Sequence, residues 1–437
     1  MTDKGMFMRK FFLLLIAIFS FFIGSPSALA EDFSVAAKHA VALEVESGKI
    51  LFQQDSETKA SVASISKILS VYLVYEALAK GEVTLDTMVD ISDYAYDLSV
   101  NPELSNVNMD ERSYSVRDLL NASLITSSNS AIIALAEKIA GSEAAFVDRM
   151  KTKVQEWGIT DTKIVNVSGL DNSDLGTNIY PGSSTEDSNL FSALDVAIIA
   201  RRLILDYPQV LAITSLKTYD FGGNAYNNTN QMLSGGTHAR IGVDGLKTGT
   251  SDSAGASFLA TTQEAGMRII TVVLNATDGQ TSPENRFIAT NDLMNYVYAN
   301  FSRIAIAEKD KPFNNSKIMV FNGEKKTSPV VAAADLYVVK RNQTDKTVTA
   351  TFTSELTEID APLTAGTYIG KLQLNDQDLI GKGYIEDQAS VDMVLANDMK
   401  EAAWPISWWN NFVRYVNEQI QKYYADLLKG IVFLLYK

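Results

Sequence analysis

The most constraining feature of this sequence is the uneven distribution of its apolar residues, which gather at the two ends of the chain. Near the start, basic residues precede an apolar run over 11–23, and Ala28-Leu29-Ala30 follows. A basic start, a short apolar core and an A-x-A site are typical of a secretory signal peptide. The run is shorter than the roughly 20 residues that a membrane-spanning helix needs. We therefore expect residues 1–30 to be a cleaved signal peptide rather than a retained membrane span.

The apolar residues at the other end recur at every third or fourth position. They are Trp409, Phe412, Val416, Ile420, Tyr423, Leu427 and Ile431. This spacing places them on one helical face, and basic residues with tryptophans among them are typical of a helix that lies in a membrane surface. We therefore expect residues 401–437 to form an amphipathic helix that anchors the chain peripherally. The alternative is an ordinary helix packed on the protein.

Between these ends, a chain of 437 residues is long enough for two domains. Residues 31–305 mix helical and strand patterns without strict alternation, which predicts an α+β domain with helices and an antiparallel sheet. The polar segment 309–316 is an expected linker. Short alternating runs with turn residues then predict a small all-β, sandwich-like domain over 306–400.

Within the first domain, the apolar periodicity places several elements. Helices are expected over 64–79, 116–125, 130–139 and 191–205, and strands over 40–45, 48–52, 255–262 and 267–275. The last two strands, joined by a short turn containing glycine, predict a hairpin. The segment Ser115 to Asp118 fits a capping box at the start of its helix.

Few side chains in this composition are suited to redox or metal chemistry. There is no cysteine, which excludes disulfides, thiolate zinc sites and a cysteine nucleophile. Only His39 and His238 are available for an imidazole metal site or for the base of a Ser-His-Asp triad. A net charge of −14 argues against nucleic acid as a partner. We expect no metal and no cofactor.

The pattern S-x-x-K occurs twice, as Ser56 with Lys59 and as Ser64 with Lys67. The first copy stands in a polar stretch, whereas the second opens a helix so apolar that we expect it to be buried. A spacing of three puts Ser64 and Lys67 on one helical face. Burial and the helix N-terminus both lower the pKa of a lysine, so Lys67 is a candidate general base for the Ser64 hydroxyl. The alternative is a capping serine with an outward lysine.

Two further motifs follow in the chain. The sequence S-S-N at 127–129 lies in the break between two predicted helices, where polar residues commonly act as caps. The run V-D-G-L-K-T-G-T at 243–250 precedes the predicted hairpin. On an edge strand, Lys247 and Thr248 would present a cation and a hydroxyl to a carboxylate, and Gly249 would let a substrate backbone approach closely.

In this order, S-x-x-K, S-x-N and K-T-G are the signature of penicillin-binding proteins and class A β-lactamases. The chain resembles the serine-type D-alanyl-D-alanine carboxypeptidases, the low-molecular-weight penicillin-binding proteins, and most of all their form in streptococci and related Gram-positive cocci. The resemblance covers nearly the whole chain and includes the segments 63–67, 71–76, 169–170, 192–195, 228–230, 243–250 and 408–417. It implies a serine β-lactamase/DD-peptidase-like catalytic domain, followed by the small β-domain and the C-terminal helix.

The sequence departs from the family pattern at four places. Ser128 stands where glycine or alanine is common, Ser130 where aspartate is frequent and Ser251 where threonine is usual, and the loop 171–189 is long. None of these departures removes a catalytic side chain. The loop is the one expected to affect which muropeptides fit.

The resemblance implies acyl transfer on peptidoglycan stem peptides. Ser64 would attack the carbonyl of the penultimate D-alanine, with Lys67 as the base, and β-lactam antibiotics such as penicillin would acylate the same serine. Ser127 would relay a proton to the leaving D-alanine. Asn129 would hold both the substrate amide and Lys67.

The resemblance also implies a site for the substrate carboxylate. Lys247, Thr248 and Thr250, around Gly249, would receive this group, and the backbone N–H groups of Ser64 and Thr250 would form an oxyanion hole. Arg286 is the candidate for a second carboxylate contact, with a surface ion pair as the alternative. The signal peptide and the anchor would place the enzyme on the extracellular face of the cell membrane.

Three alternatives remain open from the sequence. A class A β-lactamase needs a carboxylate in an E-x-x-L-N setting, and the segment 186–189 is one residue short of it. A DD-transpeptidase would use the same site, because the choice between water and an amine depends on pocket geometry. A non-catalytic, wall-associated binding protein is disfavoured by the intact Ser64, Lys67, Ser127 and Lys247.

Overall fold

The computed structural model describes residues 33–435, so the expected signal peptide lies outside the described residues. The first domain contains an antiparallel sheet with the strand order β2-β1-β11-β10-β9. These strands are β1 (Ala37–Glu44), β2 (Ile50–Gln54), β9 (Val243–Ser251), β10 (Gly255–Glu264) and β11 (Met267–Ala276). The predicted β10–β11 hairpin is confirmed, and β9, which carries the K-T-G motif, is an edge strand.

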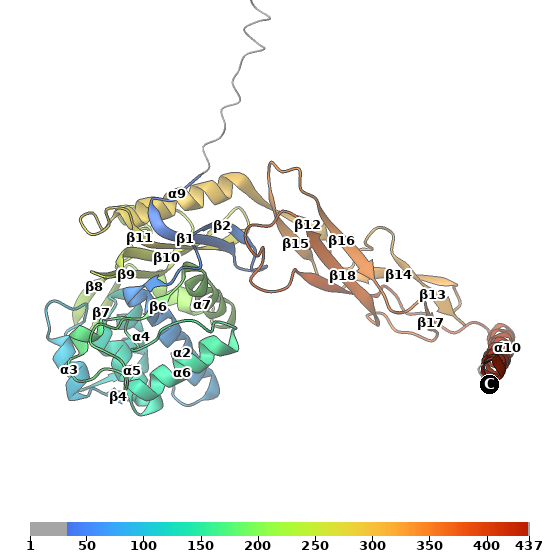
Figure 1. Ribbon diagram of the computed structural model, residues 1–437, viewed down its shortest axis with the longest axis horizontal. Helices are drawn as coiled ribbons and strands as arrows, with labels where there is room; N and C mark the ends of the chain where they lie inside the picture. Colours follow the sequence, from blue (N-terminus) through green and yellow to red (C-terminus); the bar gives the residue numbers. More distant parts are fainter. Residues whose placement is uncertain (1–32, 436–437) are drawn as a thin grey trace, which may run out of the picture. The chain divides into compact units, whose positions relative to one another are not determined.

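Helices cover both faces of this sheet. Helix α9 (Asn285–Asn300) packs on β10 and β11 from one side, and α7 (Ala193–Asp206) packs on β1 and β11 from the other (Figure 1). Strands covered on both faces need apolar side chains in both directions. This explains why β10 and β11 are buried along almost their whole length instead of alternating.

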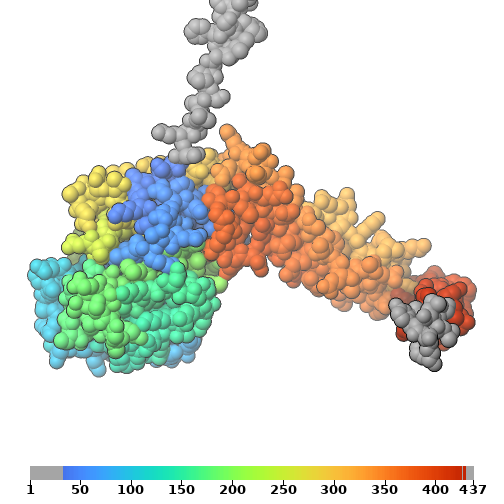
Figure 2. All heavy atoms as spheres, viewed as in Figure 1, coloured from blue at the N-terminus to red at the C-terminus, as the bar shows by residue number. Residues whose placement is uncertain are grey.

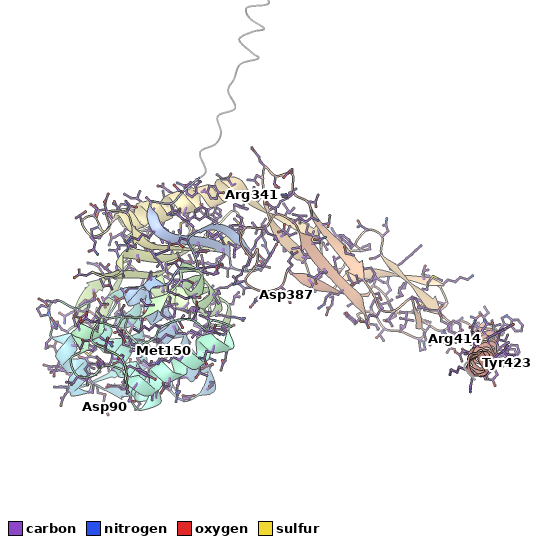
Figure 3. The ribbon with its side chains drawn as sticks, viewed as in Figure 1. Asp90, Met150, Arg341, Asp387, Arg414 and Tyr423 are labelled. Carbon is purple, nitrogen blue, oxygen red and sulfur yellow. The ribbon has the colours of Figure 1, made fainter. Side chains whose placement is uncertain are left out.

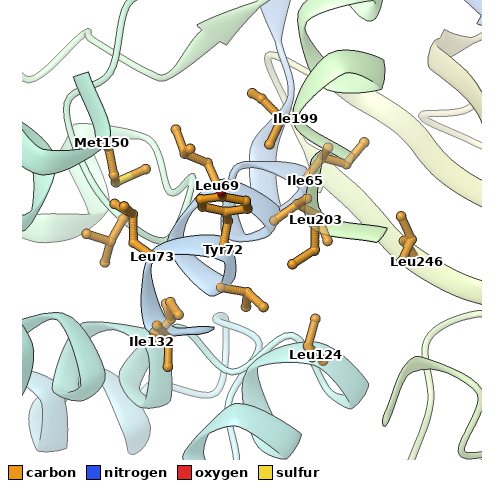
Figure 4. Close-up of a cluster of buried hydrophobic side chains, with 14 of the residues drawn as sticks. Ile65, Leu69, Tyr72, Leu73, Leu124, Ile132, Met150, Ile199, Leu203 and Leu246 are labelled. Atoms are coloured by element: carbon orange, nitrogen blue, oxygen red, sulfur yellow. The ribbon is translucent and has the colours of Figure 1, made fainter. Parts of the chain in front are cut away.

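The central helix of the domain is α2 (Lys67–Lys80), which contacts α4, α5, α6 and α7. A helix surrounded in this way must be apolar on every side. It follows a 3-10 turn, η1 (Ala63–Ser66), so Ser64 stands just before the α-helix and Lys67 at its first position. It ends at Gly81, whose φ of 73° is a left-handed C-cap. Figure 4 shows this domain's core, with side chains from η1, α2, α4 to α7 and β9 that include Ile65, Leu69, Tyr72, Leu124, Ile132, Met150, Leu203 and Leu246.

The remaining elements of this domain are short helices and strand pairs. They are α3 (Asp93–Ser99), α4 (Val116–Ile125), α5 (Asn129–Ala140), α6 (Glu143–Glu156), α8 (Val210–Thr214), η2 (Asn172–Leu175), β3 (Ala60–Ser61), β4 (Met88–Asp90), β5 (Ser113–Ser115), β6 (Leu190–Phe191), β7 (Thr218–Phe221) and β8 (Asn224–Asn227). The expected capping box at Ser115 is half formed, because the Asp118 carboxylate accepts from the Ser115 hydroxyl instead of its backbone N–H. A complete box joins Ser192 and Asp195 at the start of α7.

The second domain is all-β, as the alternating runs predict. Strand β12 (Phe301–Ala307) pairs with β15 (Leu336–Arg341). A second sheet has the order β16-β18-β19-β14-β13-β17, with β13 (Lys317–Phe321), β14 (Thr327–Ala332), β16 (Val348–Thr353), β17 (Glu358–Asp360), β18 (Tyr368–Asp376) and β19 (Ser390–Leu395). The linker predicted at 309–316 is wrong, because β12 precedes it and pairs within the same domain. The chain passes from α9 into β12 at Asn300–Phe301 without a linker.

Lys49, in the β1–β2 turn, forms hydrogen bonds with residues of the second domain; Figure 2 shows the heavy atoms of the chain coloured along the sequence. Lys49, completely buried, donates to the Asp376 carboxylate and to the Val339 carbonyl oxygen at 2.8 Å. Tyr384 donates to the same carboxylate. Because unpaired buried charges are costly, this ion pair ties the turn to the second domain. The last described element is helix α10 (Trp404–Leu435). Among the described helices, none has a stretch long and apolar enough to cross a bilayer.

Candidate active site

The structure brings Ser64 and Lys67 together at the start of α2. The Nζ atom of Lys67 lies 2.9 Å from Ser64 Oγ, 2.7 Å from Asn129 Oδ1 and 2.8 Å from the Ser168 carbonyl oxygen. Lys67 is completely buried, and among the described residues no carboxylate pairs with it. Burial, followed by repulsion from the Lys247 ammonium, holds the pKa of Lys67 well below its ordinary value.

The lowered pKa favours the neutral amine of Lys67, and its three partners can accommodate that form. The Asn129 and Ser168 oxygens can only accept hydrogen bonds, whereas the Ser64 hydroxyl can also donate. A neutral amine has two N–H donors for the first two and a lone pair for the hydroxyl. The arrangement therefore directs the Ser64 proton toward Lys67, as general-base activation of a serine requires.

Ser127 lies between α4 and α5, as predicted, and has a left-handed backbone with φ of 65°. Its hydroxyl is buried and has no hydrogen-bond partner among the described residues. Ser127 also lines the same cleft as Ser64. A left-handed non-glycine residue is strained by about 1 kcal/mol or more. Such strain, together with an unpartnered hydroxyl, is typical of a residue held in place for chemistry.

The S-x-N loop is held by Ser105 and Asn106, which carry no recognisable motif in the sequence. Asn106 Oδ1 accepts hydrogen bonds at 2.9 Å from both the N–H and the hydroxyl of Ser130. Ser105 offers its carbonyl oxygen to Asn129, both to its backbone N–H and to its side-chain amide at 3.0 Å. The departures from the family pattern thus have a local role, since Ser128 caps α5 and Ser130 binds Asn106.

The segment that supplies the Ser168 carbonyl is itself fixed by buried polar groups. Asn166 Oδ1 accepts the Gly169 N–H at 2.7 Å, and the Glu143 carboxylate accepts the Val167 N–H at 3.0 Å. Gly169 has φ of 80°, and a Cβ there would lie 1.9 Å from the Ala63 carbonyl oxygen. The sequence signalled only the glycine. The Ser168 carbonyl oxygen cannot be recognised from the sequence, because every residue has a backbone carbonyl.

Strand β9 forms one wall of the cleft with Thr248 and Thr250. Thr248 donates to the Thr229 hydroxyl at 2.8 Å. The reason expected for Gly249 is wrong. A Cβ there would lie 2.5 Å from the Val62 carbonyl oxygen, so this glycine lets β9 approach the segment that carries the nucleophile rather than a substrate.

Arg286 is buried at the start of α9, and the described residues offer it no ion pair, which excludes the surface ion-pair alternative. Its Nη1 donates to Thr250 Oγ1 at 2.7 Å and to the Gly249 carbonyl oxygen at 3.0 Å. Burial lowers the pKa of Arg286 to about 10. Its guanidinium therefore stays charged at neutral pH and lies directly beside the K-T-G strand.

Positive charge gathers beside the cleft. Lys247 lies close enough to Lys67 and to Arg286 for their charges to interact, and in the described part of the chain none of the three forms a salt bridge, although the Glu284 carboxylate, which also lines the cleft, attracts Arg286. Burial, followed by the charge of Arg286, lowers the pKa of Lys247 to about 7. Clustered, desolvated cations bind a carboxylate strongly. The cleft, of about 390 Å³, is therefore suited to a substrate that ends in one.

The other candidates from the sequence lie elsewhere. Lys59, of the first S-x-x-K copy, pairs with Asp161 and Asp195, while Ser56 is buried below the surface. His39 pairs with Asp55 at 2.8 Å, whereas His238 lines the cleft, a position that the sequence did not signal. In the β-lactamase-like segment, Asn189 is used to hold the backbone of Val165 and Asn166. The described residues contain no cluster suited to a metal ion.

A serine beside a buried lysine whose partners are uncharged, in a cleft that Arg286 also lines, is an arrangement suited to serine acyl transfer on peptides with a free carboxyl end. The chain belongs to the D-alanyl-D-alanine carboxypeptidase family, whose sequence profile matches residues 26–278. A profile for the C-terminal domain of penicillin-binding protein 5 matches residues 301–401. The protein is therefore a serine-type, penicillin-binding D-Ala-D-Ala carboxypeptidase that acts on peptidoglycan peptides, and the family resemblance is confirmed.

Curated relatives and solved structures agree with this assignment. The D-alanyl-D-alanine carboxypeptidase DacC of Escherichia coli is 29% identical over 369 residues, covering 82% of this chain and 86% of the relative. A crystal structure of PBP3 from Streptococcus pneumoniae is 48% identical, with a TM-score of 0.77, and matches 84% of this chain and 100% of that one. Penicillin-binding protein D2 of Listeria monocytogenes in an ampicillin-bound form is 30% identical, with a TM-score of 0.52, over 61% of this chain and 99% of that one.

Proposed function

We propose that this carboxypeptidase removes the terminal D-alanine of stem pentapeptides through an acyl-enzyme on Ser64, with Lys67 as the base. The observation that carries this proposal is the set of contacts around the buried Lys67 amine. Two acceptors occupy its N–H groups, and the Ser64 hydroxyl is the remaining neighbour, at 2.9 Å. This arrangement keeps the lone pair of the amine directed at the nucleophile.

In the acylation step, Ser64 Oγ forms a bond to the carbonyl carbon of the penultimate D-alanine and its proton passes to Lys67 Nζ. The carbonyl oxygen becomes an oxyanion, which the backbone N–H groups of Ser64 and Thr250 stabilise. The C–N bond then breaks, and Ser127 passes its proton to the leaving amine while it receives the proton held by Lys67, which returns Lys67 to the neutral amine. Its unpartnered hydroxyl supports this role. Water finally hydrolyses the ester and frees Ser64.

The substrate carboxylate binds at the K-T-G strand. Lys247 and Arg286 supply positive charge, and Thr248 and Thr250 supply hydroxyl groups. The hydrogen bond from Arg286 to Thr250 supports a combined action of the two residues. Penicillin carries a similar carboxylate next to a strained amide, so the same contacts direct its β-lactam carbonyl to Ser64.

Labelled penicillin and a peptide ending in D-Ala-D-Ala test this assignment. Incubated with residues 31–437, penicillin should form one covalent adduct, on Ser64 by peptide mapping, and the peptide should release D-alanine. Ser64→Ala should abolish both. Ser56→Ala, the serine of the other S-x-x-K copy, is the matched control and should retain both. An adduct on Ser56, or D-alanine release by Ser64→Ala, would overturn the assignment.

We also propose that α10 lies on the extracellular surface of the cell membrane. Arg414 attaches one face of this helix to the second domain, because it pairs with Asp360 and Glu358 and its guanidinium stacks on Phe321. Figure 3 labels Arg414 and Tyr423 on this helix. Exposed aromatic residues lie elsewhere on the helix, namely Trp404, Trp408, Trp409, Phe412, Tyr415, Tyr423 and Tyr424. Such a surface is suited to the headgroup region of a bilayer.

Flotation with anionic vesicles tests the anchor. The chain 31–437 should float with the vesicles, and the chain 31–403 should not, although it should still bind penicillin. Substitution of serine for Trp409, Phe412 and Tyr423 should weaken flotation at least tenfold. Serine at the polar-face residues Asn410 and Gln421 is the matched control. Equal flotation of both sets of variants would contradict the proposed face.

A further inference from the structure

The active-site cleft is lined by more residues than the proposed reaction uses. Ser64, Ser127, Thr248, Thr250 and Arg286 line it together with residues that have no role in that reaction. We call one group of these residues the leaving-residue lobe; it consists of Gln231, Thr237, His238, Glu284 and Phe287. If Ser64 receives the scissile carbonyl and Arg286 the terminal carboxylate, the residue between them is the one that leaves. The lobe therefore adjoins the leaving residue, an inference that rests on the proposed roles of Ser64 and Arg286.

Within the lobe, His238 is held by a backbone hydrogen bond and by stacking of its ring. Its backbone N–H donates to the Gln231 carbonyl oxygen at 3.1 Å. Its ring stacks on Phe287, with the centroids 5.5 Å apart and the planes at 30°. Phe287 is buried and lies next to Arg286 in the chain, so the imidazole is fixed relative to the carboxylate-binding guanidinium. Neither ring nitrogen of His238 has a hydrogen-bond partner within residues 33–435.

The polar groups of the lobe are available to a ligand. The side chains of Gln231, Thr237 and Glu284 also make no hydrogen bond or ion pair with other described residues. They offer an amide, a hydroxyl and a carboxylate beside an imidazole and a buried aromatic ring. The methyl group of D-alanine can use none of these groups, whereas a side chain with an amide or a hydroxyl can bond to several.

We propose that the leaving-residue lobe is a subsite for the side chain of the C-terminal D-residue, and that it accepts polar side chains larger than methyl. His238 is its specificity-determining residue. The enzyme then also removes C-terminal D-residues such as D-asparagine or D-serine from peptidoglycan peptides. A lobe that merely holds solvent gives no such preference, because a larger side chain gains no bonds there.

The test compares acetylated L-Lys-D-Ala-D-X peptides in which X is alanine, asparagine or leucine. D-asparagine and D-leucine have similar shape and differ in polarity. For the full chain 31–437, kcat/KM with D-asparagine should lie within about threefold of that with D-alanine, and D-leucine should be at least tenfold worse. A value for D-asparagine a hundredfold below that for D-alanine would overturn the proposal. Loss of D-alanine release itself would instead contradict the proposed function.

The second part of the test compares variants of His238 and His39 by the ratio of kcat/KM for the D-asparagine peptide to kcat/KM for the D-alanine peptide. His238→Ala should lower this ratio at least tenfold, mainly through KM, and His238→Gln, which restores a hydrogen-bonding side chain, should recover most of it. His39→Ala, the other histidine, should leave the ratio unchanged. Labelling with penicillin reports whether each variant is folded, and His238→Asn replaces any that does not label. An unchanged ratio in the labelled His238 variant would overturn the proposal.

Discussion

The two S-x-x-K segments have the same spacing, but the pKa values of their lysines shift in opposite directions. Lys59 is partly exposed, and although burial acts in the other direction, its bonds to Asp161 and Asp195 raise its pKa. Lys67 is completely buried, faces only neutral oxygens and has a pKa well below its ordinary value. The comparison teaches that the charge of the neighbours, supplied by distant segments, decides whether the pattern yields an ion pair or a base.

Removal of the base should have the largest effect. Lys67→Met should lower the rate constants for penicillin acylation and D-alanine release by about a thousandfold, because general-base catalysis contributes roughly a hundredfold to ten-thousandfold. Lys59→Met, the same change in the other segment, should stay within about threefold of the parent. Stopped-flow acylation with labelled penicillin measures both, and melting curves report folding. Similar losses in the two variants would contradict the assignment of Lys67.

A carboxylate beside Lys67 should make it resemble Lys59. Asn129→Asp would place a negative charge about where Asn129 Oδ1 now lies, 2.7 Å from Nζ. An opposite charge at that distance favours the ammonium form and raises the pKa, so the neutral fraction of Lys67 falls. Activity at pH 7 should drop about a hundredfold and should partly return as the pH is raised. A uniform loss at every pH would show instead that Asn129 acts only by holding the substrate.

Substrate binding through Lys247, the cation next to Lys67, should depend on pH in the opposite sense and weaken as the pH rises. Burial, followed by the charge of Arg286, lowers the pKa of Lys247 to about 7, so Lys247 is an ammonium below this pH and neutral above it. The KM for a peptide ending in D-Ala-D-Ala should therefore rise about tenfold between pH 6 and pH 9, since one charge-assisted bond is lost. Lys247→Arg should remove this rise. A KM of the parent enzyme that is independent of pH would contradict a carboxylate contact through Lys247.

Local patterns were sufficient to predict the parts of the site that lie within one segment. The apolar residues after Ser64 predicted a buried helix, and the strand patterns over 255–262 and 267–275 predicted the hairpin that follows the K-T-G motif. Contacts that combine distant segments were not predictable. The Ser168 carbonyl oxygen, the amide of Asn106 and the ring of His238 approach the site only once the chain has folded, and their residue types are ordinary in loops.

Two sequence expectations were wrong for related reasons. Gly249 was explained by substrate approach, but a Cβ there would meet the Val62 carbonyl oxygen, nearly two hundred residues away. The segment 309–316 was predicted as a linker because it is polar and contains proline, although it joins two strands of one domain. In both cases the sequence feature, a glycine or a polar segment, was identified correctly. Its structural role depends on segments that approach it only in the folded chain.

The smallest effects should come from the ion pairs of Lys59. Asp161 has a side chain that is 71% exposed, so Asp161→Asn should change the free energy of unfolding by no more than about 0.5 kcal/mol. Asp195 is 10% exposed and also closes the capping box with Ser192, so Asp195→Asn should cost about 1 to 2 kcal/mol. Urea titration measures both values. Neither variant should alter penicillin acylation, because replacing a carboxylate beside Lys59 by an amide changes only stability. Replacing the amide of Asn129 beside Lys67 by a carboxylate should instead change reactivity. A slower acylation in Asp195→Asn would mean that the two lysines are coupled through α7 and are not independent sites.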